Sequence, residues 1–218
     1  ENDPKAFIVR EGMPQQQPTA YADYPNPGAA DVTLHLGRGG RTSGTLSVDD
    51  RPGQGRETLV DNVELSGGAL AALADSPHRL IYASPVLAED VHVSGTARIT
   101  IRVGASKPAA NLSVWLVALP WEPGANAAAT ERANVITRGW ADPQNDQSLS
   151  RGTPLRAGEL RTVTFTLQPD DQIIPAGKRI ALMVMSSDRD FTLWPAPGTE
   201  LTVDVDATSL TLPVVGGE

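Results

Sequence analysis

The stretch from Ser186 to Gly217 reads SSDRDFTLWPAPGTELTVDVDATSLTLPVVGG and is the most informative part of the chain for its fold. Within it, Leu201, Val203 and Val205 alternate with polar residues, which is the period expected of a strand with one wet face. The rest of the stretch has an order of residues that no general strand pattern requires. The same holds for the earlier segment Arg138–Asn145, which reads RGWADPQN. These two segments therefore carry information beyond secondary structure.

Alternation of the same kind recurs upstream of this stretch, and turn signals rich in Pro and Gly separate the alternating runs. The apolar positions of these runs are Val91 and Val93, then Ile99, Ile101 and Val103, then Val163, Phe165 and Leu167. No long helical pattern intervenes. The sequence therefore predicts an all-β fold, an antiparallel β-sandwich.

Two apolar runs show no alternation, Val114–Leu119 and Ile180–Met185. Runs of this length suit strands covered on both faces. One face would meet the sandwich core, and the other would meet a loop, a helix or another domain. A short helix is predicted between Leu59 and Asp75, although Gly67-Gly68 weakens the helical pattern. The longest predicted loops are Pro120–Glu131 and Ala141–Pro154.

The bulk composition places limits on domain number and partners. A chain of 218 residues suits a single all-β domain, and we expect a Pro-rich connector over residues 1–30 and one sandwich domain over residues 31–218. The net charge of −8 argues against nucleic acid, and no apolar run is long enough for a membrane span. The chain has no cysteine and no recognisable secretory signal. The compartment, cytoplasmic or secreted, is left open.

The sequence lacks the motifs of a serine hydrolase. No serine has glycine at both −2 and +2, as the G-x-S-x-G elbow requires, and Ser43 fails on both sides. His35 and His92 each lie between two apolar residues, which predicts that both project from the solvent faces of strands. His78 follows Pro77 in a turn. We therefore predict no catalytic residue in this chain.

Oxygen-rich segments are candidate cation sites. Asp142, Asn145, Asp146 and Gln147 lie in one loop, but their spacing does not match a calcium loop. The pairs Asp170-Asp171 and Asp49-Asp50 are predicted to lie in solvated turns. No metal and no cofactor is predicted.

Tryptophans are the remaining candidates for a site. Trp115, inside an apolar run, is predicted to be core. Trp121, Trp140 and Trp194 have three readings that the sequence leaves open: local core, inter-domain contact, or a platform on which a sugar ring stacks. Asp142-Pro143 is expected to form a rigid turn that holds Trp140, so these two residues join the candidate set.

Together, the two opening segments resemble the C-terminal domain of serine-type Xaa-Pro dipeptidyl-peptidases, relatives of the bacterial cocaine esterases. Further segments fit the family in the same order: 21–28 leading into 31–37, 80–87, 93–96, 106–112 and 175–180. The resemblance implies a jelly roll of the galactose-binding-like type. It also implies that the Ser-His-Asp triad lies upstream on an α/β-hydrolase domain, so no catalytic residue is carried over to this chain.

The function implied by the resemblance is that of a non-catalytic domain. It would pack on the α/β-hydrolase domain of the same polypeptide and border the cleft for a peptide substrate, from which the parent enzyme removes an N-terminal X-Pro dipeptide. Whether the chain forms a homo-oligomer is left open. The alternative is a free-standing carbohydrate-binding module. The unalternated strand Ile180–Met185 is expected to distinguish the two, because an interface domain needs a second apolar face there.

Overall fold

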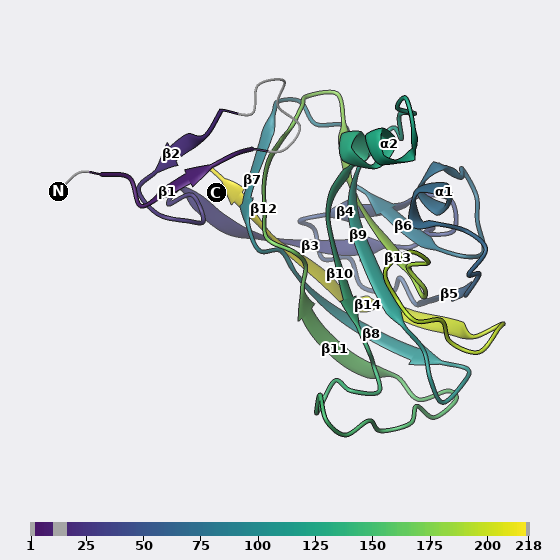
Figure 1. The fold of residues 1–218 in the computed structure, drawn as a ribbon. Helices are drawn as coiled ribbons and strands as arrows, with labels where there is room; N and C mark the ends of the chain where they lie inside the picture. The colour runs from purple at the N-terminus through teal and green to yellow at the C-terminus, as the bar shows by residue number, and fades with distance from the viewer. Residues whose placement is uncertain (1–2, 11–16, 217–218) are drawn as a thin grey trace.

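The structure is a computed structural model that describes residues 3–10 and 17–216. Its elements are, in chain order, β1 (Ala6–Ile8), β2 (Thr19–Tyr21), β3 (Ala29–Gly37), β4 (Gly44–Ser47), β5 (Arg56–Val60), α1 (Gly67–Ala72), β6 (Leu80–Ala83), β7 (Val91–Gly95), β8 (Arg98–Ala105), β9 (Leu112–Leu119), α2 (Ala127–Asn134), β10 (Val135–Ala141), β11 (Arg161–Thr166), β12 (Asp170–Ile174), β13 (Arg179–Met185) and β14 (Glu200–Val215). The all-β prediction is confirmed (Figure 1).

One large sheet makes up most of the molecule. Its strands follow the order β10-β9-β13-β6-β4-β3-β14-β7-β12, while β8 pairs with β14 and β11, and β5 pairs with β14. The path curls back on itself, and this arrangement fits a sandwich (Figure 1). The pairing is antiparallel except between β4 and β6, which run parallel. The galactose-binding-like jelly roll and the boundary at residue 31 remain predictions.

The 16-residue strand β14 pairs with four other strands of this sheet and so links them. Its first residues pair with β5 and β8, and its last residues pair with β3 and reach β7. Strand β14 pairs with β8 on both sides of a register shift between Asp204 and Ser209, and across the same shift its other partner changes from β5 to β3. This is the strand that the alternation from Leu201 onward predicted.

Both unalternated runs form strands that are buried on both faces, as predicted. Alternate residues of β9 and β13 contribute to two separate apolar clusters. The main cluster contains Leu116 and Leu182 and fills the interior of the curled sheet. The second cluster contains Trp115 and Met183, and it is covered by Leu70 and Ala71 of α1.

This cover corrects the interpretation of Ile180–Met185. The second face of β13 is buried by the chain's own helix, so the strand gives no evidence for an inter-domain surface. The run therefore cannot distinguish an interface domain from a free-standing module, because continuous apolar residues report burial and not the identity of what covers them.

The buried guanidinium of Arg79 holds α1 in place. Its side chain donates to the carbonyl oxygens of Leu70 and Leu73 at the end of α1, at 3.4 and 2.6 Å, and to Gly40 O at 2.9 Å. A cation at this position also meets the negative end of the helix dipole. Burial lowers the pKa of Arg79 from its usual value.

Helix α2 corrects a second expectation. Residues 127–131 were predicted to belong to a loop, yet they begin an eight-residue helix. Asn126 is its N-cap, and the side-chain oxygen accepts the backbone N–H of Ala129 at 2.9 Å. Three successive alanines follow this cap, and alanine has the highest helix propensity. Neither α1 nor α2, the helices of the described residues, has the length and apolar content to cross a membrane.

The glycine pair at the start of α1 allows a test of this packing. A Cβ on Gly67 would overlap the Trp115 ring, whereas the nearest atom to a Cβ on Gly68 is 3.5 Å away in Trp121. Trp115 is 1% exposed and cannot move aside. We expect Gly67→Ala to cost about 1–3 kcal/mol of unfolding free energy. Gly68→Ala should be neutral or stabilising by up to about 1 kcal/mol. Urea unfolding of both variants checks this, and equal effects would contradict it.

Candidate functional site

A buried carboxylate, Asp188, lies at the centre of the first candidate site. The residue follows β13 and is 0% exposed. Its Oδ2 accepts the indole N–H of Trp115 at 2.7 Å and that of Trp140 at 2.9 Å. The two tryptophans come from the neighbouring strands β9 and β10. One carboxylate oxygen therefore fixes the orientation of two large rings.

Stacking interactions extend this arrangement toward the surface. The guanidinium of Arg138 lies 4.4 Å from the centre of the Trp115 ring and 4.8 Å from that of Phe191. The rings of Trp140 and Phe191 stack with their centres 5.6 Å apart. Arg138 also pairs with Glu131 of α2 at 3.3 Å. Cation–π contacts of this kind are stronger when the cation is shielded from water.

The electrostatics of Asp188 follow from its burial. Burial raises the pKa of Asp188 above its usual value, and this effect outweighs the opposing effects of the indole donors and of the Arg138 charge. Its second oxygen, Oδ1, is buried and accepts no hydrogen bond from the described residues. The site therefore stabilises an ionised carboxylate incompletely.

The segment after Asp188 exposes apolar side chains on a fixed backbone. Phe191, Leu193 and Trp194 are 56%, 89% and 57% exposed, and we call residues 191–194 the apolar loop. The backbone N–H groups of Phe191 and Thr192 each donate to Asp188 O at 2.9 Å. The Asn111 side chain donates to Leu193 O, which fastens the loop to the start of β9.

The predicted candidates divide between this site and other places. Trp140 is in β10 and anchors the apolar loop through Phe191, while Trp194 is part of the loop itself. Trp121 instead packs on the second apolar cluster. The turn after Trp140 forms as expected, since Asp142 Oδ1 accepts the backbone N–H of Gln144 at 2.9 Å, and Pro143 O accepts from Arg161 at 2.8 Å. The inter-domain roles of these candidates remain predictions.

Sequence reasoning missed Asp188, Phe191 and Leu193. A signal was present, because three large apolar residues within Phe191–Trp194 follow a polar run in which no strand alternation explains them. The role of Asp188 left no such signal, since only the fold brings Trp115 and Trp140 to one oxygen.

A depression of about 500 Å³ lies beside Trp140. It is lined in part by Phe165, Thr162 and the predicted oxygen-rich loop. The side chains of that loop are already engaged, because Asp146 pairs with Arg161 at 3.2 Å and Asn145 donates to Ser148 O at 3.1 Å. Within residues 3–10 and 17–216, no three His, Cys, Asp or Glu side chains gather in a way that could hold a metal ion.

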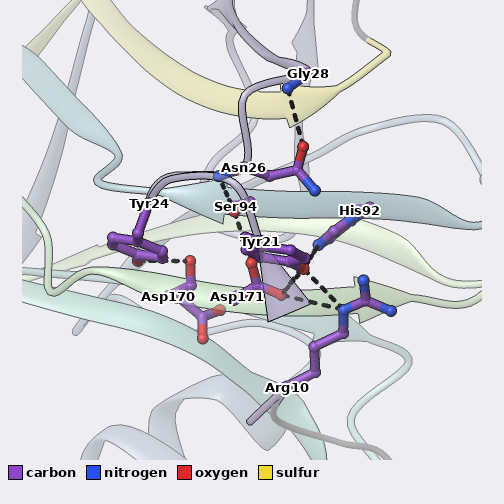
Figure 2. Close-up of polar contacts among 9 residues, drawn as sticks. All are labelled: Arg10, Tyr21, Tyr24, Asn26, Gly28, His92, Ser94, Asp170 and Asp171. Carbon is purple, nitrogen blue, oxygen red and sulfur yellow. Dashed lines mark hydrogen bonds and ion pairs between the residues drawn. The ribbon is translucent and has the colours of Figure 1, made fainter. Parts of the chain in front are cut away.

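The surroundings of a second buried carboxylate, Asp171, show that two predictions from the sequence were wrong (Figure 2). Asp170 and Asp171 were predicted to lie in a solvated turn, but they begin β12 and are buried. Pairing of β12 with β7 places Asp171 opposite Ser94, whose hydroxyl donates to it at 2.6 Å. His92 was predicted to face solvent, but its side chain is 15% exposed and its Nε2 lies 3.0 Å from Asp171 Oδ1. The chain's N-terminal part, through Tyr21, covers this face.

Serine, histidine and aspartate, the residue types of a catalytic triad, therefore lie together here, but their hydrogen bonds do not connect them as a triad does. Both Ser94 and His92 bond to the carboxylate, whereas a nucleophilic serine must donate its proton to the histidine. The Ser94 hydroxyl oxygen also accepts the backbone N–H of Asn26 at 3.0 Å. This geometry orders a polar network and leaves Ser94 without a base.

Comparison with known proteins gives a consistent result. Residues 2–214 match the model of the family described as X-Pro dipeptidyl-peptidase C-terminal non-catalytic domain. The chain is 50% identical, over its whole length, to a protein of Rhodopirellula baltica provisionally named as a Xaa-Pro dipeptidyl-peptidase, and it spans 34% of that relative.

Solved structures show the same fold at low sequence identity. An aminopeptidase of a marine sediment Thaumarchaeota archaeon matches 97% of this chain with a TM-score of 0.76 at 15% identity, and the match spans 41% of that protein. An α-amino acid ester hydrolase matches 91% of the chain with a TM-score of 0.68 at 16% identity, over 39% of its own length. At these identities the likeness shows the fold alone.

The raised pKa of Asp188 leads to a prediction about pH. Above the usual carboxyl pKa of 3.8 and below the raised value, the folded chain binds more protons than the unfolded chain. The stabilising effect of protonated Asp188 is therefore complete below pH 3.8 and is lost as the pH rises through this window. Asp188→Asn has no such titration. We expect the unfolding free energy of the native chain, minus that of Asp188→Asn, to decrease as the pH rises above 3.8. Urea unfolding measures this, and a constant difference would contradict it.

Proposed function

We infer the function of this chain from its family, because it belongs to the X-Pro dipeptidyl-peptidase C-terminal non-catalytic domains. The chain spans about a third of the length of its Rhodopirellula relative, so it is one part of a longer kind of polypeptide. We propose that it packs on the α/β-hydrolase domain of such a polypeptide, a serine hydrolase that releases N-terminal X-Pro dipeptides. In that position it borders the substrate cleft.

The apolar loop is the observation that supports this packing. Phe191, Leu193 and Trp194 expose large side chains close together in the sequence, although an apolar core was available to bury them. Adjoining exposed apolar side chains on a soluble domain commonly mark a protein contact. The strand Ile180–Met185 cannot provide this contact surface, because α1 covers its second face.

The supporting framework suits the loop for docking. Asp188 accepts two loop N–H groups through its backbone oxygen, and its side chain fixes Trp140, on which Phe191 stacks. A loop that is already ordered loses little conformational entropy when a partner covers it. Its side chains can therefore contribute most of their burial energy to holding the two domains together.

The chain alone is expected to have no hydrolase activity. It lacks the G-x-S-x-G elbow, and its Ser94 donates to Asp171 without a histidine base. Incubation with an Ala-Pro chromogenic amide and with a short-chain ester should give background rates. Turnover that a serine-directed fluorophosphonate abolishes would contradict the proposed division of labour.

Leu193→Ser tests the docking role of the apolar loop. The side chain is 89% exposed, so removing it should not affect the stability of this chain. The variant and the unchanged chain should therefore have the same midpoint of urea unfolding. In the parent polypeptide, loss of a buried leucine should cost about 1.5–3 kcal/mol of domain contact, which weakens docking by roughly 10- to 100-fold. Cleavage of the inter-domain segment by a protease measures that docking.

Val48→Ser provides a matched control. Val48 is 65% exposed and lies just after β4, in another part of the sheet, so its removal should leave cleavage unchanged. Equal cleavage of the native and Leu193→Ser polypeptides would contradict the proposal. Loss of binding to a glycan array, with cohesion intact, would favour the carbohydrate-binding module.

A further inference from the structure

The strands β1 and β2 form a small sheet of their own. Their antiparallel register joins Ala6 to Tyr21 and Ile8 to Thr19, and no described strand of the large sheet pairs with them. Figure 1 shows the pair beside the end of β14, on the opposite side of the molecule from α1. An isolated pair of strands is marginally stable in water. Something outside this small sheet must therefore hold it.

Apolar packing is not sufficient for this purpose. Among residues 3–10 and 17–28, Tyr21 is the one buried side chain, at 6% exposure. The apolar side chains Phe7 and Val9 of the same segment are 66% and 48% exposed. The contact between this segment and the large sheet thus centres on a tyrosine.

The hydroxyl of Tyr21 leads to Asp171. It donates to Asp171 Oδ1 at 3.0 Å and accepts from Arg10 Nε at 3.0 Å. Arg10 also pairs directly with the same carboxylate at 3.4 Å, and its guanidinium lies 5.6 Å from the centre of the Tyr21 ring. His92 Nε2 lies 3.0 Å from the same oxygen, from the strand β7.

The other carboxylate oxygen holds a second point of the segment. Ser94 donates to Asp171 Oδ2 at 2.6 Å and accepts the backbone N–H of Asn26 at 3.0 Å. Asn26 in turn accepts the N–H of Gly28 through its side chain at 2.9 Å, just before β3 begins (Figure 2). Asp171 is thus linked to residues 10, 21 and 26, with Ser94 as the intermediate in the last case.

The charge makes these bonds strong. The Asp171 side chain is 3% exposed, so the groups around it, one of which is the cation Arg10, replace water as its hydrogen-bond donors. Hydrogen bonds to a charged acceptor are about twice as strong as neutral ones. Loss of the charge would therefore weaken the links to Arg10, Tyr21 and Asn26 together. The bond from the Tyr24 hydroxyl to Asp170 O, at 3.3 Å, does not involve this carboxylate.

We propose that Asp171 is the acceptor that docks the β1–β2 pair on β7 and β12, and so holds residues 3–10 and 17–28 against the domain. The role concerns this chain alone, so it stands whether or not the apolar loop docks on a hydrolase domain. Asp171 is here a positioning residue with no part in chemistry.

Asp171→Asn tests the proposal by amide hydrogen exchange of the whole chain. The asparagine keeps one acceptor oxygen and turns an N–H₂ group toward donors. We expect amides of β1 and β2 to exchange at least tenfold faster, and those of β9 and β13 to be unchanged. Tyr21→Phe is the second variant, since it keeps the ring and removes only the hydroxyl, and it should accelerate the same amides several-fold.

The control is Asp23→Asn in the same segment. Asp23 pairs with Lys5 at 3.0 Å, and both side chains are well exposed, so this pair should contribute little. Its removal should leave the exchange of β1 and β2 unchanged. Unchanged exchange of β1 and β2 in Asp171→Asn and Tyr21→Phe would overturn the proposal. An equal acceleration of β9 and β13 in Tyr21→Phe would also overturn it, because it would show a global loss of stability.

Discussion

The burial of Trp115 on the outer face of β9 is the contact on which the other features depend. Gly67 of α1 packs on the ring, Arg138 stacks over it, and its indole N–H reaches Asp188. A sheet strand with apolar residues on both faces requires a cover, and α1 provides it. Because the ring is 1% exposed and bonded at its N–H, it is also a rigid support for the apolar loop. The second core and the candidate docking surface are thus parts of one packing arrangement.

The two buried carboxylates differ in how well the surrounding groups compensate for the loss of water. Asp171 has the Arg10 guanidinium and three further donors around its two oxygens. Asp188 has two indole donors on one oxygen and a cation that stacks on rings instead of pairing with it, and burial raises its pKa. Burial is offset where full hydrogen bonding accompanies the charge. The first carboxylate fixes the path of the N-terminal segment, and the second fixes the aromatic framework behind the apolar loop.

Alternation predicted β7, β8, β11 and β14 because the side-chain period of a strand is written in the sequence. The absence of alternation predicted that β9 and β13 are buried on both faces. It did not reveal what covers them, and the expected inter-domain surface on β13 was wrong for that reason. The helix α2 was missed although Asn126 and the alanines after it form a cap and a favourable first turn. Asp171 and His92 were placed in solvent because pairing with β7 and cover by Tyr21 are contacts between distant parts of the chain.

The sequence by itself determined the fold class, the two doubly buried strands and, through residues 138–145 and 186–217, the family. These properties depend on local periodicity and on the order of residues, which are readable without coordinates. Only the tertiary structure decided that Trp115 and Trp140 share Asp188, that α1 closes the second core, and that Asp171 meets residues from the N-terminal segment. The physical reason is that burial and hydrogen bonding between distant residues depend on which strands become neighbours. In a sheet whose order departs so far from chain order, that neighbourhood is set by the whole fold.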